Sequence, residues 1–182
     1  VLCAVRGRWR WYWVMVVLLL MVKADVWLVA VPLGIYVAVR HNKKMGLLTA
    51  GISLAWFLVA FFAIQPALSG VPAGSLDSWR WPFGGLGGLV TTALLRPWEV
   101  ISYMLTAEKV KYLFQLLTPL LFLPLLTWRS LIAVPVLSFH LISNFWYQSN
   151  LHYHYHSLIT PLLCAASLFA LERFRRLKVR WA

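Results

Sequence analysis

The membrane character of this chain is clearest in residues 11–39, which read WYWVMVVLLLMVKADVWLVAVPLGIYVAV. Lys23 and Asp25 are the only charged residues in this run. A helix that spans a membrane needs about 17–25 apolar residues, so the run is too long for one comfortable span. Basic residues flank the run on both sides: Arg6, Arg8 and Arg10 before it, and Arg40, Lys43 and Lys44 after it.

These basic flanks indicate how the run is folded, because positively charged flanks of membrane helices favour the cytoplasm. If both flanks stay there, the chain must cross the membrane and return. We therefore predict two short helices joined by a turn at Lys23-Ala24-Asp25. The alternative is a single tilted helix that buries the ion pair between Lys23 and Asp25.

The composition of the whole chain also indicates a membrane protein. Of its 182 residues, 62% are hydrophobic and only 12% are charged, and the mean hydropathy is +0.75. Soluble domains are about 45–50% apolar and about 25% charged, so this chain has too few charges to cover a soluble surface. Disorder, a disulfide scaffold and almost any soluble enzyme are excluded.

The net charge of +12 points to lipid as the partner. The basic residues occur in short clusters between apolar runs, as topology signals and contacts to anionic lipid do. We therefore expect membrane lipids as partners. We do not expect nucleic acid, because no soluble basic face is available to bind it.

Four further apolar segments complete the predicted fold, which is an all-α polytopic membrane protein with about six membrane helices. These segments are residues 46–64, 110–126, 130–142 and 157–171. Between them, residues 66–109 are rich in Gly, Pro, Ser and Trp, which break long helices. We predict that this stretch is a structured outer loop with one or two short interfacial helices, the second starting at Pro97.

The distribution of basic residues predicts the topology of a multi-pass protein of the cell membrane. Alternation of the spans places both the N-terminal flank and the basic tail after residue 172 in the cytoplasm. Four of the five acidic residues and the histidine run then lie outside, so we expect the protein to work on its outer face. Because the chain starts at Val1 within an apolar sequence, we expect it to be one membrane domain from the C-terminal part of a longer protein.

Lys23 and Asp25 form the first candidate site, because ionisable residues at membrane depth are costly and are taken as functional by default. The pair could face a polar cavity and bind an anionic head group or a neighbouring helix. It could equally be a local ion pair at an interfacial turn, with the Lys23 side chain reaching to water.

His152, His154 and His156 form the second candidate site, within HYHYH at the start of the last span. In a helix, the first and third histidines share a face; in an extended chain all three do. They could contact a phosphate or substrate, or belong to an aromatic belt at the membrane boundary. No carboxylate or cysteine lies nearby to complete a metal site, so we expect neither a metal nor another cofactor.

The third candidate site is a set of basic residues among tryptophans in the predicted outer loop. Such a set could hold a lipid-linked phosphate or a sugar, or it could anchor the loop helices at the interface. No sequence pattern assigns a catalytic residue. The basic residues are Arg80, Arg96, Lys109 and Lys111, and the tryptophans are Trp79, Trp81 and Trp98.

Three stretches of the chain resemble a bacterial integral-membrane family, domain of unknown function 2079. The first contains KAD at 23–25, RHNKKMGLLT at 40–49 and AWFL at 55–58. The second contains KYL at 111–113, LPLL at 123–126, LIAVP at 131–135 and LISN at 141–144. The third is HYHYH at 152–156, continuing to Pro161. Two positions depart from the pattern that we expect: Ala24 stands in place of an acid, and Trp128 in place of a proline.

That family looks like a relative of the polytopic glycosyltransferases (GT-C type) that use polyprenyl-phosphate sugars on the outer face. The resemblance implies a glycosyltransferase-like protein that moves a sugar from a lipid-phosphate carrier. In such enzymes the key acid lies in the first outer loop, so we expect this chain to lack it. A transporter or flippase, and a non-enzymatic membrane assembly protein, are the alternatives.

Overall fold

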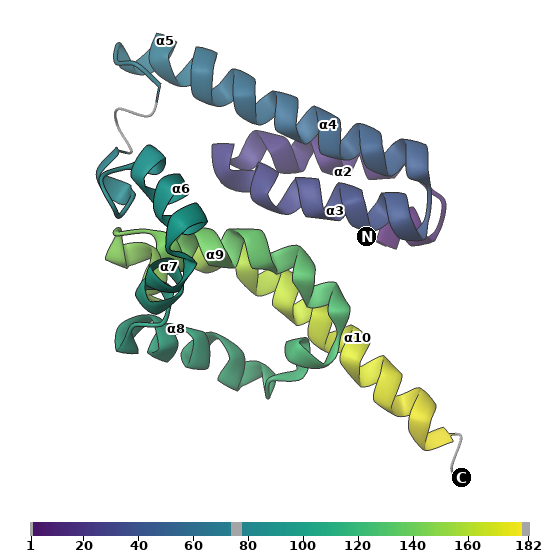
Figure 1. Cartoon of the computed structure of the whole chain (residues 1–182). Helices are drawn as coiled ribbons and strands as arrows, with labels where there is room; N and C mark the ends of the chain where they lie inside the picture. The colour runs from purple at the N-terminus through teal and green to yellow at the C-terminus, as the bar shows by residue number, and fades with distance from the viewer. Residues whose placement is uncertain (1, 74–77, 180–182) are drawn as a thin grey trace. The chain divides into compact units, whose positions relative to one another are not determined.

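The computed structural model describes residues 2–73 and 78–179, and over these residues it contains helices and no strand (Figure 1). The chain divides into two compact units, residues 1–76 and 77–182, which we call the N-terminal and C-terminal units. The helices of the N-terminal unit are α1 (Leu2–Val5), α2 (Trp9–Val22), α3 (Trp27–Arg40), α4 (Lys43–Val59) and α5 (Gln65–Ser69). Those of the C-terminal unit are α6 (Leu86–Leu95), α7 (Pro97–Met104), α8 (Ala107–Leu117), α9 (Val134–Ile142) and α10 (Ile159–Val179).

Within residues 2–73 and 78–179, two helical stretches are long and apolar enough to cross a membrane: Lys43–Ser69, with 27 residues, and His154–Arg175, with 22 residues. Only 11% and 28% of their most apolar windows are buried inside the protein, unlike the core helices of a soluble domain. The all-α membrane class predicted from the sequence is confirmed. Four shorter apolar helical segments accompany them: Trp9–Val22, Trp27–Arg40, Leu86–Leu95 and Trp128–Ile142.

The N-terminal unit contains the predicted turn between two short helices. Lys23 ends α2 in an extended conformation, with φ −164° and ψ 151°. A single 3₁₀ turn, η1 (Ala24–Val26), follows before α3 begins at Trp27. The prediction of two helices is therefore confirmed, and the alternative of one tilted helix is wrong.

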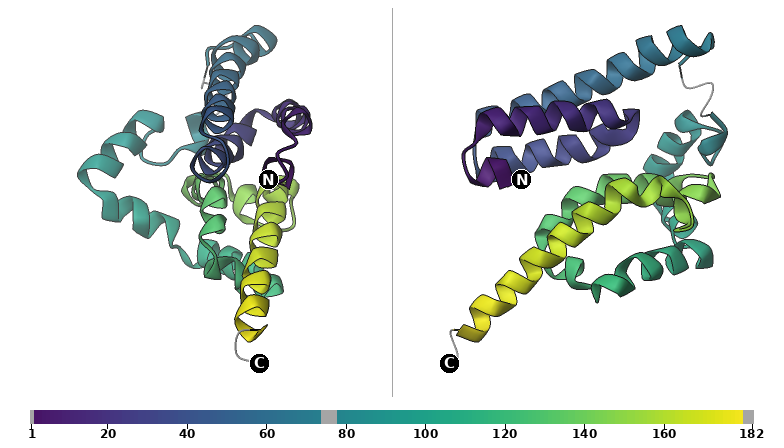
Figure 2. Two further views of the ribbon diagram at one scale, coloured as in Figure 1. Left: turned by 90° about the vertical axis from the view of Figure 1, so that its right-hand side faces the viewer. Right: turned by 180° about the vertical axis from the view of Figure 1, so that it is seen from behind.

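Helices α3 and α4 form a tight antiparallel hairpin, and α2 lies beside them (Figures 1 and 2). The two helices approach closely where each has a glycine. A Cβ atom at Gly34 would lie 2.6 Å from the backbone nitrogen of Ala50, and one at Gly46 would overlap the backbone of Ala38. Small residues spaced four apart allow this kind of packing between apolar helices, where side-chain burial from water contributes little. The turn is closed by Asn42, whose side chain accepts a hydrogen bond from the Met45 N–H at 3.0 Å.

A buried hydrogen bond joins α2 to α4. The hydroxyl of Thr49 donates to the carbonyl of Met45 at 2.8 Å, which uses its only proton. The hydroxyl of Tyr12 lies 2.8 Å from the Thr49 oxygen and is therefore the donor of that bond. Both side chains are almost completely buried, so this pair fixes α2 on the hairpin.

The long helix of the N-terminal unit ends later than we predicted. The sequence placed its end at Ile64, before Gln65-Pro66. Instead the helix passes through a π turn, η2 (Ala60–Ile64), and continues as α5 to Ser69, where Gly70 adopts a left-handed conformation. Pro66 has no N–H, and its ring crowds the preceding turn of an α-helix. The wider π turn lies directly before it, where the Gln65 N–H donates to the Ala60 carbonyl, five residues earlier.

The two short helices predicted in residues 66–109 are α6 and α7, and α7 does begin at Pro97. Proline suits the first position of a helix because its missing N–H needs no partner there. Helix α7 also packs against α9. Within this predicted loop, residues 74–77 lie outside the described residues.

The apolar run 110–126 is not one membrane helix, which corrects our prediction. Helix α8 ends at Leu117, and the short turns η4 (Thr118–Leu120) and η5 (Leu123–Leu126) follow. Between them Leu121 and Phe122 have positive φ angles of 50° and 57°, a conformation that L residues rarely adopt. Pro119 and Pro124 lack the N–H groups that a continuous helix would use, so the run folds into turns that pack on α10.

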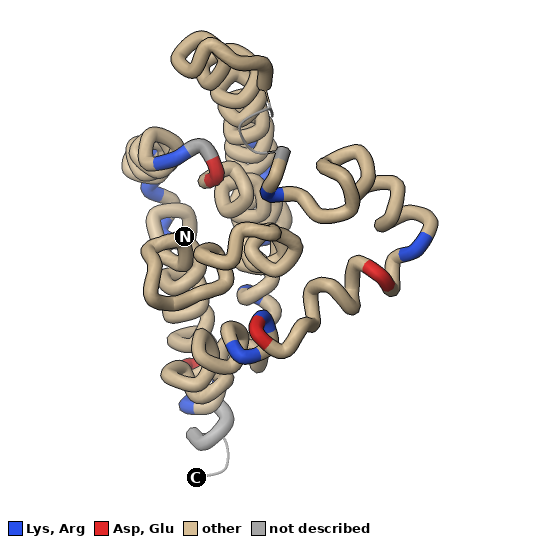
Figure 3. The backbone as a smooth tube through the Cα atoms, turned by 90° about the vertical axis from the view of Figure 1, so that its left-hand side faces the viewer, with Lys and Arg blue, Asp and Glu red and all other residues tan. Residues whose placement is uncertain are grey.

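The last two predicted segments are present with different starts. Residues 130–142 begin in a 3₁₀ turn, η6 (Trp128–Ala133), and become regular helix at α9. The final helix follows two further turns, η7 (Trp146–Ser149) and η8 (His154–Leu158), and α10 runs to Val179. Residues 180–182 of the basic tail lie outside the described residues. Figure 3 shows that long stretches of the helices carry no charged residue, as the hydropathy requires.

Candidate functional site

Two predicted site residues, Lys111 and His152, line the same open groove in the C-terminal unit. The groove has a volume of about 670 Å³ and combines a cation, an imidazole, two amides and a hydroxyl with apolar side chains. Its two walls are α8 with the following turn, and the segment that precedes η8. The lining residues are Lys111, Phe114, Gln115, Thr118, Pro119, Asn150, Leu151 and His152.

The amphipathic character of α8 determines which of its residues face the groove. Residues 111, 114, 115 and 118 recur at helical spacing and form one face. Tyr112 and Leu116 lie on the other face and are buried. The Tyr112 hydroxyl lies 3.3 Å from Nδ1 of His140 on α9, so a buried polar contact holds α8 in place.

The opposite wall is held by a local turn at Asn150. The side-chain oxygen of Asn150 accepts a hydrogen bond from the backbone N–H of His152 at 3.0 Å. Such a turn lets an asparagine side chain replace a backbone partner and fixes the residue two positions later. It therefore sets the position of His152 at the groove.

Lys109 does not reach the groove, although it lies only two positions before Lys111. Residues two apart on a helix point to different faces. Lys109 is only 8% exposed, and its Nζ atom donates to the Tyr103 carbonyl at 3.2 Å. Burial lowers the pKa of Lys109 to about 8, and the neighbouring carboxylate of Glu108 opposes this shift. This lysine contacts Tyr103 near the start of α8 and is not among the residues that line the groove.

Asn144 connects three segments of the C-terminal unit, a role that we did not predict. Its side-chain oxygen accepts a hydrogen bond from the Tyr103 hydroxyl. Its backbone N–H donates to the Arg80 carbonyl at 2.8 Å, and its side-chain amide donates to the Trp79 carbonyl at 3.4 Å. Burial also raises the pKa of the Tyr103 hydroxyl. The sequence showed an asparagine after α9 but not its partners, because they come from distant segments.

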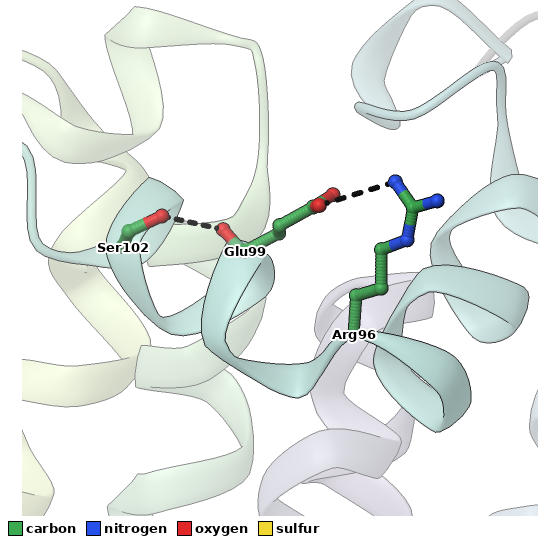
Figure 4. A network of polar contacts seen from close by, with 3 residues as sticks. All are labelled: Arg96, Glu99 and Ser102. Atoms are coloured by element: carbon green, nitrogen blue, oxygen red, sulfur yellow. Dashed lines mark hydrogen bonds and ion pairs between the residues drawn. The ribbon is translucent and has the colours of Figure 1, made fainter.

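Arg96 forms a local ion pair with Glu99 (Figure 4), and it is not among the residues that line the groove. Its guanidinium lies 3.3 Å from the carboxylate of Glu99, and both side chains are well exposed. Ser102 donates to the Glu99 carbonyl within the same helix at 2.9 Å. Arg80, from the same predicted set, lies over the rings of Trp79 and Phe145 at 5.5 and 5.2 Å.

The three histidines do not converge on one point. His152 lies at the groove, and His154 stacks on Tyr155 with 4.6 Å between ring centroids. His156 is half-buried, and its Nδ1 atom is buried with no hydrogen-bond partner in the part of the chain that the structure describes. Among the residues that the structure describes, no group of three or more His, Cys, Asp or Glu side chains could hold a metal ion.

Lys23 and Asp25 form an ion pair at the turn between α2 and α3, in the N-terminal unit. The Nζ atom of Lys23 lies 2.9 Å from a carboxylate oxygen of Asp25. The two side chains are 44% and 27% exposed, so neither charge is deeply enclosed by protein. Both of our interpretations, a site for an anionic group and a local interfacial pair, remain compatible with this geometry.

A family model described as "Predicted membrane protein (DUF2079)" matches residues 1–182. The chain belongs to this family. Searches of curated proteins and of solved structures found no match. Membership in DUF2079 agrees with the long exposed apolar helices of the fold.

Proposed function

We propose that this DUF2079 protein binds a lipid-linked phosphate in the groove between α8 and residues 150–152. We further propose that it is a glycosyltransferase-like protein that uses a polyprenyl-phosphate sugar on the outer face of the cell membrane. The observation that carries the proposal is the meeting of Lys111 and His152 at one groove, together with amide and hydroxyl groups.

The chemistry of the lining suits a phosphate that carries a sugar and an apolar chain. The ammonium group of Lys111 has three donors for phosphate oxygens, and the imidazole of His152 can donate in either protonation state. The amides of Gln115 and Asn150 can bond sugar hydroxyls. Phe114, with its ring 57% exposed, supplies apolar surface for the prenyl chain.

The experiment measures binding of a polyprenyl phosphate to the full-length protein in nanodiscs, with the uncharged polyprenol as reference. Lys111→Gln should weaken phosphate binding by about tenfold, which corresponds to one charge-assisted hydrogen bond. His152→Ala should weaken it several-fold. Neither variant should change polyprenol binding.

Arg96→Gln is the matched control, because it removes an exposed cation outside the groove. It should leave phosphate binding within about twofold of the wild type, since screened surface charges contribute little. Equal losses in Arg96→Gln and Lys111→Gln would show attraction by net charge alone and would contradict a site at the groove. Transfer of labelled sugar from the lipid, lost in Lys111→Gln, would identify the protein as a transferase.

A transporter is the second candidate, and the broken apolar run at residues 118–123 favours it. Transporters often bind their substrates where membrane helices are interrupted. In this case the protein should move the labelled lipid between leaflets of a proteoliposome without any transfer of its sugar.

A further inference from the structure

A second groove lies along the exposed face of α4, in the N-terminal unit. It has a volume of about 510 Å³ and is apolar except at one end, where Lys44 stands. All of its lining residues follow helical spacing on this one helix. They are Lys44, Leu47, Leu48, Gly51, Ile52 and Ala55.

Gly51 forms the floor of this groove. A Cβ atom at Gly51 would meet no atom of the described residues within 4 Å. Gly34 and Gly46 differ, because each lies against the backbone of the neighbouring helix. Packing within the unit therefore does not require a glycine at position 51, and its missing side chain leaves a depression flanked by Leu47 and Leu48.

The length of the groove matches one leaflet of a bilayer. Helix α4 rises about 1.5 Å per residue, so Lys44 and Ala55 are separated by about 16 Å along its axis. The hydrocarbon core of a membrane is about 30 Å thick, and one leaflet supplies about half of it. One acyl chain that lies along the helix would therefore cover the apolar lining, with its head group at Lys44.

The charge at the end of the groove selects the kind of lipid. Among the described residues, no carboxylate forms an ion pair with Lys44. Lys43 and Arg40 stand close by in sequence but do not line the groove. An anionic head group is favoured there over a zwitterionic one, as in other basic clusters beside membrane helices.

We propose that this face of α4 binds one anionic phospholipid, with the phosphate at Lys44 and one acyl chain on the depression at Gly51. A second helix could also pack on Gly51 and Ala55, since small residues four apart favour such contacts. Lys44 distinguishes the two occupants, because an apolar helix has no group that would pair with an ammonium ion at the end of the groove.

The test is native mass spectrometry of the full-length protein released from vesicles of phosphatidylglycerol and phosphatidylcholine. The wild type should retain one phosphatidylglycerol in preference to phosphatidylcholine. Lys44→Gln should lower this preference by about fivefold, the effect of one lysine near an anionic surface. Lys43→Gln is the matched control: it removes the neighbouring exposed charge, which does not line the groove, and should change the preference by less than about twofold.

A second pair of variants tests the acyl chain. Gly51→Leu should fill the depression and lower retention of both lipids, while Ala63→Leu, on an exposed position of the same long helix, should not. Because Gly51 has open space, Gly51→Leu should keep the thermal stability of the wild type. Equal effects of Lys43→Gln and Lys44→Gln would overturn the proposal. So would unchanged lipid retention in Gly51→Leu, or a dimer in the wild type that Gly51→Leu dissociates, which would make a second copy the occupant.

Discussion

The ammonium nitrogen of Lys109 lies 3.6 Å from the centre of the Tyr103 ring and also donates to the carbonyl of the same residue. Tyr103 in turn donates to Asn144, which holds the backbone at Trp79 and Arg80. The start of α8, the end of α7 and the turn before Trp81 are therefore joined by the contacts of Lys109, Tyr103 and Asn144. These contacts hold α8, which forms one wall of the groove that contains Lys111.

Replacing Lys109 should reveal a pH-dependent contribution to stability. Burial lowers the pKa of Lys109 to about 8, below the value of about 10.4 for an exposed lysine. Between these values the unfolded state binds more protons than the folded state, so the free energy of unfolding rises with pH. In Lys109→Met the side chain cannot be protonated, so this pH-dependent contribution to the free energy of unfolding is absent. The wild type should therefore gain thermal stability relative to Lys109→Met as the pH rises from about 8 to about 9.5.

Thermal unfolding in detergent at several pH values measures this difference. Arg96→Met is the control, because arginine stays protonated throughout the range and its difference from the wild type should not change with pH. A constant difference between the wild type and Lys109→Met would mean that the ammonium group keeps its water contacts in the folded protein.

The hydrogen bond between Tyr12 and Thr49 should respond unequally to its two simplest substitutions. Tyr12→Phe leaves Thr49 bonded to the Met45 carbonyl, so the expected cost is about 0.5–1.5 kcal/mol. Thr49→Val leaves the buried Tyr12 hydroxyl without a partner, at an expected cost of about 1–3 kcal/mol.

The double variant, Tyr12→Phe with Thr49→Val, tests whether the unpaired Tyr12 hydroxyl causes the larger loss. With both polar groups removed, no buried donor is left unpaired, and the stability should recover to near that of Tyr12→Phe. Additive losses in the unfolding measurement would show that water or lipid reaches this contact.

Substitution by alanine should change the stability in opposite directions at Gly34 on α3 and at Gly51 on α4. Gly34→Ala places a methyl group 2.6 Å from the Ala50 backbone, so the helices must separate and stability should fall by about 1–3 kcal/mol. Gly51→Ala meets open space and should raise stability by up to about 1 kcal/mol, because alanine favours helix over glycine. Similar effects of the two substitutions, measured by thermal unfolding, would contradict the close packing of the hairpin.

Local chemistry explains which parts of the fold could be predicted from the sequence. The start of α7 at Pro97 follows from that residue alone, and the turn at Lys23 from the length of the apolar run and its basic flanks; both are confirmed. The end of the long helix was missed because a π turn can admit Pro66, and no single residue signals such a turn. The bend at Leu121 and Phe122 was missed because Pro119 and Pro124 show where a helix is weakened, but not that the resulting turns pack on α10, far along the chain.

For the candidate site too, the sequence predicted some of the residues but not their arrangement. The sequence nominated Lys111 and His152 separately, from basic charge and from a histidine run, but their meeting at one groove requires the tertiary fold. The opposite orientations of Lys109 and Lys111 follow from helical spacing once α8 is known to begin at Ala107. Gln115 and Asn150 carried no signal of their own, because single amides are common in turns and on helix surfaces.

The pair formed by Lys23 and Asp25 should lose stability asymmetrically, because the two side chains differ in reach. After Asp25→Ala, the long Lys23 side chain can extend its ammonium group to the membrane surface, so the expected cost is about 0–1 kcal/mol. After Lys23→Ala, the short Asp25 carboxylate cannot follow. Leaving one charge of a buried pair unpaired costs about 3–5 kcal/mol, and the 27% exposure of Asp25 places the expected loss at or below the lower end of that range. The double variant, Lys23→Ala with Asp25→Ala, should recover most of the stability that Lys23→Ala loses.

The exposed pair Arg96–Glu99 serves as the control for this last measurement, since both of its side chains reach solvent freely. Each of its single alanine variants should cost no more than about 1 kcal/mol, without asymmetry. Thermal unfolding of the protein in nanodiscs gives all the values under one condition. If Lys23→Ala proves as mild as the Arg96–Glu99 variants, water surrounds the turn between α2 and α3. The pair would then be a local ion pair at an interfacial turn, because water can solvate the Asp25 carboxylate when Lys23 is absent.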